Sequence, residues 1–153
     1  MGGVKANDLV PDFEAVDDTG ASVRLSDYLV RGPVVLFFYP KAMTPGCTAE
    51  ACHFRDLVQE FAAFNATPVG ISHDAPEKQS RFREQQDLNF PILSDPDKRV
   101  AEMFGVKRWG PLLNKRMTFV IDTDLRLLDV FKSETNFEGH ADDALAALKA
   151  HKG

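Results

Sequence analysis

Residues 33–47 read Pro33-Val-Val-Leu-Phe-Phe-Tyr-Pro-Lys-Ala-Met-Thr-Pro-Gly-Cys47, an apolar run followed by a turn rich in proline and glycine. A short apolar run between two prolines is typical of a strand that is buried on both faces of a sheet. Thr44 and Pro45 suit the N-cap and the first position of a helix, which we expect over residues 45–64. Because ligands of open α/β sheets gather at the carboxyl ends of strands, this turn is a candidate site for chemistry.

Strand and helix signals alternate along the rest of the chain. The predicted order is β, β, α, β, α, β, α, β, β, α. The further strands include residues 13–16, 67–72, 117–121 and 127–131. The further helices cover residues 78–86, 98–104 and 140–151. Strand–helix–strand crossovers imply parallel pairing, and the short link before the last strand implies an antiparallel hairpin at one edge. We therefore predict one α/β domain over residues 1–153, a central mixed sheet with helices on both faces.

The charge balance excludes some classes of function. Lysine and arginine number 18 against 23 aspartates and glutamates, which gives a net charge of −5. Nucleic-acid and anionic-membrane surfaces need clustered positive charge, so neither partner is expected. The two cysteines, Cys47 and Cys52, are too few for a secreted disulfide scaffold, so we expect a cytoplasmic protein in which paired thiols indicate redox or metal chemistry.

Cys47 falls at about the third position of the predicted helix. A sulfur there meets backbone N–H groups that lack an intrahelical acceptor, together with the positive end of the helix, and both stabilise a thiolate. An activated nucleophile is thus the functional interpretation. A buried cysteine that packs as a small hydrophobe is the structural alternative.

Helical spacing places the two sulfurs on different faces. Cys47 shares a core-facing stripe with Ala51, Phe54, Val58 and Phe61, whereas Cys52 lies on a polar stripe. Five residues of helical rise put the two Cα atoms about 8–9 Å apart, while a disulfide needs them within roughly 7 Å. If the cysteines pair, the start of the helix must therefore unwind.

Other interpretations of these residues are weaker. The spacing of Cys47, Cys52 and His53 does not match structural zinc sites, and it also differs from the C-x-x-C motif of disulfide exchange. We expect all four histidines to be surface residues. Arg116 precedes a strand and could supply a cation to the thiolate, although nothing local selects it over the other arginines.

Taken together, several segments resemble the peroxiredoxins. Pro40, Thr44 and Cys47 match the P-x-x-x-T-x-x-C signature, and residues 44–56 resemble the bacterioferritin-comigratory, or Q-type, branch. The resemblance extends over nearly the whole chain, through Pro11-Asp-Phe13, Leu25-Ser-Asp27, Phe38-Tyr-Pro-Lys41, Phe90-Pro-Ile-Leu-Ser-Asp-Pro96 and Arg116-Met-Thr-Phe-Val-Ile-Asp122.

The resemblance implies a thioredoxin-like fold and the reduction of hydrogen peroxide and organic hydroperoxides. Cys47 would be the peroxidatic thiolate, Cys52 the resolving thiol that forms an intramolecular disulfide with it, and Arg116 the active-site arginine. Thr44 would hydrogen-bond the peroxide and the thiolate, and Pro40 would shield the site from water. No metal or other cofactor is required, and a thioredoxin- or glutaredoxin-type donor would reduce the disulfide. We expect a monomer or a weak homodimer.

Two features depart from the pattern of this branch. His53 stands where relatives often have a small or different residue, and residues 107–114 do not match closely. Two other functions stay open at this point: a redox sensor in which oxidation of Cys47 changes a partner surface, and an adaptor whose cysteines are structural.

Overall fold

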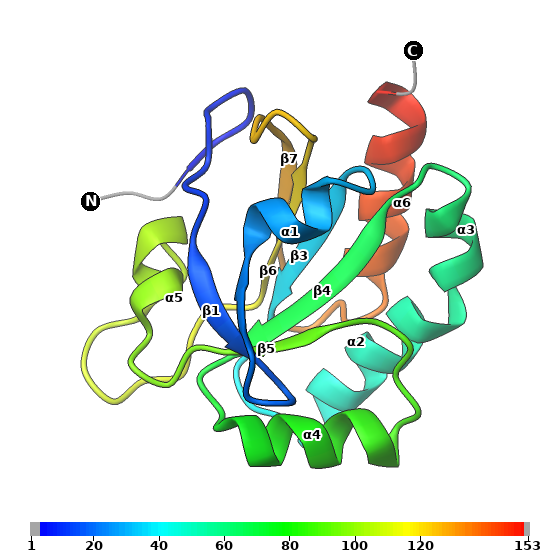
Figure 1. The fold of residues 1–153 in the computed structure, drawn as a ribbon. Helices are drawn as coiled ribbons and strands as arrows, with labels where there is room; N and C mark the ends of the chain where they lie inside the picture. The colour runs from blue at the N-terminus through cyan, green and yellow to red at the C-terminus, as the bar shows by residue number, and fades with distance from the viewer. Residues whose placement is uncertain (1–3, 152–153) are drawn as a thin grey trace.

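The computed structural model describes residues 4–151 and contains one seven-stranded mixed sheet with helices on both faces (Figure 1). The strand order across the sheet is β2-β1-β5-β4-β3-β6-β7. The strands are β1 (Glu14–Asp17), β2 (Ser22–Arg24), β3 (Val34–Phe38), β4 (Thr67–Ser72), β5 (Ile92–Ser94), β6 (Met117–Ile121) and β7 (Leu127–Lys132). The helices are α1 (Leu25–Leu29), α2 (Pro45–Asp56), α3 (Val58–Ala62), α4 (Pro76–Gln85), α5 (Arg99–Phe104) and α6 (Gly139–His151).

The pairing follows from the connections. β3, β4 and β5 run parallel because a helical crossover joins each to the next, and β6 lies antiparallel to β3 on the other side. The predicted hairpin of β6 and β7 is present at the edge of the sheet. The predicted fold class, a mixed sheet with helices on both faces, is confirmed.

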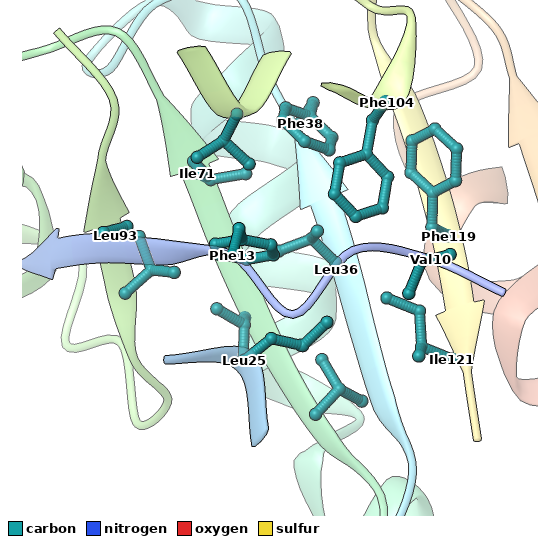
Figure 2. Close-up of a cluster of buried hydrophobic side chains, with 14 of the residues drawn as sticks. Val10, Phe13, Leu25, Leu36, Phe38, Ile71, Leu93, Phe104, Phe119 and Ile121 are labelled. Atoms are coloured by element: carbon teal, nitrogen blue, oxygen red, sulfur yellow. The ribbon is translucent and has the colours of Figure 1, made fainter. Parts of the chain in front are cut away.

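All five residues of β3 are buried, as expected for a central strand covered on both sides. One face of the sheet packs against α1 and α5, with Leu36, Phe38 and Phe119 meeting Phe13 and Phe104 (Figure 2). The other face, with Val35 and Phe37, packs against α2, α3, α4 and α6. Figure 1 shows these helices on the opposite side of the sheet from α1 and α5. Among residues 4–151, no helix is long and apolar enough to cross a lipid bilayer.

The structure corrects three local expectations. The helix expected over residues 45–64 is broken at Leu57, whose φ of −101° and ψ of 8° end α2 and allow α3 to start in a new direction. As a result the apolar stripe stops at Phe54 and resumes at Phe61, while Val58 is only partly buried. β2 and α1 were not predicted, because elements this short carry little periodicity.

Candidate active site

The turn from β3 into α2 places Cys47 at the third position of a helix. Thr44 is the N-cap residue by its backbone angles and Pro45 follows at the first helical position, both as predicted. The Cys47 side chain is buried, with 1% exposure, on the face of α2 that packs against the sheet. The Thr44 hydroxyl does not cap the helix: it donates to the carbonyl oxygen of Lys41 at 2.8 Å, across the turn.

The buried carboxylate of Asp74 holds this turn in place. Asp74 Oδ2 accepts the backbone N–H of Ala42 at 2.7 Å and the Ser72 hydroxyl at 2.5 Å, and Lys78 lies 3.2 Å from the other oxygen. Burial acts to raise the pKa of Asp74, but these donors outweigh it and hold the pKa below its ordinary value. The N-cap residue of α4 is Ala75, and the side chain of Asp74 just before it bonds to the turn and to Ser72.

Arg116 comes from the residue before β6 and reaches the start of α2. Its side chain is 7% exposed, and its Nη1 lies 2.6 Å from Oε1 of Glu50, a fully buried carboxyl three residues after Cys47. Burial acts to lower the pKa of Arg116, but Glu50 and the Cys47 sulfur, which it also contacts, raise it above its ordinary value. The structure thus brings together Cys47 and Arg116, which are far apart in the sequence.

Gly46 and Phe137 allow this close approach. The Phe137 ring packs over the guanidinium, with its centroid 4.7 Å from the Arg116 Cζ atom. A Cβ atom at Gly46 would lie 2.7 Å from the same ring and 3.3 Å from Arg116 Nη2. Any side chain at position 46 would therefore displace the aromatic ring that covers the arginine.

His140 adds a second buried polar group that sequence reasoning missed. It was predicted to be a surface histidine, and that prediction is wrong: the residue is 2% exposed. Its Nδ1 lies 2.8 Å from Thr118 Oγ1 and 3.8 Å from Glu50 Oε2, and its Nε2 lies 2.8 Å from the Ser133 carbonyl oxygen. For Glu50 a signal did exist, because an acidic residue three positions after Cys47 lies on the same side of the helix as the apolar stripe.

Cys52 lies on the other side of α2 and is partly exposed. Its sulfur is 3.4 Å from Gln86 Oε1 at the end of α4, and Arg55 donates to the Gln86 carbonyl oxygen at 2.7 Å. On the same helix, Nε2 of His53 lies 2.8 Å from Oδ1 of Asp142, and this contact links α2 to α6. Both thiols are free and α2 is continuous between them, so the sulfurs lie on separate faces as predicted.

The comparisons with known proteins agree with this geometry. Residues 6–129 match the model of the AhpC/TSA family. The chain belongs to this family. It is 57% identical over 150 residues to a putative peroxiredoxin of Mycobacterium tuberculosis (strain H37Rv), a match that covers 96% of this chain and 97% of the relative. It is also 42% identical to peroxiredoxin Bcp of Escherichia coli (strain K12) over 159 residues, with 99% of both chains covered.

Solved structures place the chain within one branch of the family. The crystal structure of peroxidoxin BcpB from Mycobacterium tuberculosis superposes with a TM-score of 0.95 at 54% identity, over 98% of this chain and 99% of that one. The bacterioferritin comigratory protein of Xanthomonas campestris gives a TM-score of 0.85 at 30% identity, over 97% and 99%. The resemblance to the bacterioferritin-comigratory branch and the thioredoxin-like fold are therefore confirmed, and membership of the family supports a peroxidase, an oxidoreductase that acts through thiols.

Proposed function

We propose that the chain reduces hydrogen peroxide and organic hydroperoxides through the Cys47 thiolate, that Cys52 resolves the product as an intramolecular disulfide, and that a thioredoxin- or glutaredoxin-type protein recycles it. The observation that carries this proposal is the position of Cys47, buried at the third residue of α2 beside the guanidinium of Arg116. Fixed donors at this place stabilise negative charge on sulfur and on the oxygen that leaves.

The first step is an attack of the thiolate on one peroxide oxygen. The S–O bond forms as the O–O bond breaks, the sulfur loses two electrons to become a sulfenic acid, and the leaving oxygen takes a proton. Arg116 and the free N–H groups of Gly46 and Cys47 are the donors available to the developing charge. Because the Thr44 hydroxyl already donates to Lys41, its oxygen is free to accept the O–H of the peroxide. Pro40, half-buried at the end of β3, limits access of water.

The second step requires α2 to unwind. The Cys52 thiol attacks the Cys47 sulfenic sulfur, the S–S bond forms, and the sulfenic oxygen leaves as water. To reach Cys47, Cys52 must leave Gln86, and the contact of His53 with Asp142 must open. The break at Leu57 supports this step, because it separates the segment that unwinds from α3.

Mass spectrometry after one equivalent of hydrogen peroxide tests both steps. We expect the wild type to lose two hydrogens, mapped to a Cys47–Cys52 disulfide, and Cys52→Ser to stop at a Cys47 that carries one added oxygen. Cys47→Ser should consume no peroxide. If Cys47→Ser consumes peroxide as well as the wild type does, the proposal is wrong. Turnover that fails with every thiol donor, despite oxidation of Cys47, would favour a redox sensor instead.

The proposal also fixes the partners that we expect. The substrate is a hydroperoxide and the reductant is a dithiol protein that attacks the disulfide, so the reaction needs no metal, flavin or haem. We further propose that residues 1–153 act as a single domain in the cytoplasm, as a monomer or a weak homodimer, without nucleic acid or membrane partners.

A further inference from the structure

Beside Arg116, two titratable side chains face each other in the interior. They are Glu50 of α2, with no exposed surface, and His140 of α6, with 2%. Oε1 of Glu50 is bonded to Arg116, whereas Oε2 has no hydrogen-bond partner among the described residues. The nearest polar atom of His140, Nδ1, is 3.8 Å from that oxygen.

The hydrogen bonds of His140 identify its tautomer. A carbonyl oxygen only accepts, so Nε2 must carry the hydrogen that it donates to Ser133. In a neutral ring Nδ1 is then bare and accepts the Thr118 hydroxyl. Neither His140 Nδ1, which carries no hydrogen, nor the Thr118 hydroxyl, which donates to Nδ1, can then donate to Glu50 Oε2. An ionised Glu50 would therefore keep a buried oxygen without a donor, which is unfavourable, and a proton on Oε2 removes that charge.

The charges in the site indicate when that proton is present. Arg116 stays charged, and a buried site favours one anion for each cation. While Cys47 is a thiolate, it supplies that anion, and an ionised Glu50 would be a second one without compensation.

The surrounding groups support the same distribution. Burial raises the pKa of Glu50 to about 8, against the effect of Arg116, and the Glu134 carboxylate adds to the increase. Burial, followed by the charge of Arg116, lowers the pKa of His140, against its bond to Ser133 and the carboxylates of Asp143 and Glu134. The proton therefore belongs to the carboxyl group and not to the imidazole.

We propose that Glu50, positioned by His140, holds a proton while Cys47 is a thiolate and releases it when Cys47 is oxidised. The inference rests on the proposed function. The balanced step joins Cys47–S⁻, ROOH and Glu50–COOH to give Cys47–SOH, ROH and Glu50–COO⁻. The negative charge that leaves with the peroxide oxygen is neutralised by one proton, and the new Glu50 carboxylate replaces the thiolate as the counter-ion of Arg116. Glu50 thus acts through the proton and the charge that it holds beside Arg116, and His140 is a positioning residue that acts through Glu50.

Infrared difference spectroscopy tests this inference at the carboxyl group itself. Cys52→Ser protein at about neutral pH is treated with one equivalent of hydrogen peroxide, so that oxidation stops at the sulfenic acid. We expect the C=O band of a protonated carboxyl to disappear and a carboxylate band to appear. Glu50→Gln in the same background should lack both changes, and His140→Asn should shift the C=O band because the carboxyl loses the nitrogen beside it.

The matched control is Asp95, a second buried acid whose pKa is raised by burial. Asp95→Asn should leave the difference bands in place. The inference is overturned if Cys47 gains an oxygen by mass spectrometry while no protonated-carboxyl band is lost, or if the loss persists in Glu50→Gln. If Cys47 gains no oxygen at all, it is the proposed peroxidase function that fails.

Discussion

Asp74 offers the sharpest test of how the fold holds the candidate site, because it supports the turn that precedes α2 without belonging to it. Asp74→Ala leaves the Ala42 N–H without its acceptor in a position that is 2% exposed. An unpaired buried N–H costs about 1–3 kcal/mol. The lost ion pair with Lys78, whose side chain is 28% exposed, adds up to about 1 kcal/mol.

The fully buried Ser72 hydroxyl also loses the acceptor of its O–H, because Nε2 of Gln79 only donates to the Ser72 oxygen. We therefore expect Asp74→Ala to lower the free energy of unfolding by about 2–4 kcal/mol, measured by urea denaturation at neutral pH. Asp74→Asn should lose less, because an amide oxygen can still accept from Ala42. Glu84→Ala, at an exposed acid of α4, is the control and should change the value by less than about 0.5 kcal/mol.

The same substitution should affect the chemistry. A turn that is no longer fixed shifts Pro40 and Thr44 relative to Cys47, and misplacement on the order of 1 Å can cost about a hundredfold in rate. We expect the second-order rate of Cys47 oxidation, followed by stopped-flow fluorescence, to fall by about tenfold or more in Asp74→Ala. A loss of stability below about 1 kcal/mol, or an unchanged oxidation rate in the folded variant, would refute this account of the turn.

Three further predictions concern α2. The raised pKa of Glu50, about 8 against an ordinary 4.5, means that the folded state binds the extra proton, so stability should fall as pH rises between these values. Urea titrations of reduced protein should show a loss of up to about 1.4 kcal/mol per pH unit relative to Glu50→Gln, and parallel curves would contradict it. His53→Ala removes the contact with Asp142 and should speed disulfide formation about two- to threefold in quenched-flow assays, as should Asp142→Asn; slower formation would exclude a restraining role. Phe54→Ala should lower the free energy of unfolding in urea by about 3–5 kcal/mol, because this fully buried ring stacks on that of Phe37 with 4.1 Å between the ring centroids. A loss below about 1 kcal/mol would argue against that packing.

Much of the candidate site could be anticipated, because it depends on local rules. The apolar run of β3, the cap at Thr44 and the proline after it fix where α2 begins, and so place Cys47 at its third residue. The period of the helix then separates Cys47 from Cys52 before any coordinates are known. The break at Leu57 could not be anticipated, since the apolar spacing continues through it and only the packing of α3 against the sheet ends the helix there.

The sequence by itself thus determined the strand–turn–helix unit, the unequal positions of the two sulfurs and, through motif resemblance, the choice of Arg116 as a candidate site residue. The tertiary structure decided what surrounds the thiol. Arg116 meets Glu50 across 66 residues of sequence, Thr118 meets His140 across 22, and Asp74 reaches Ala42 across 32. No periodicity encodes such pairs, because each depends on the order in which the strands assemble and on the burial that follows. That burial places Glu50 beside His140 in the interior and makes Asp74 a support of the turn.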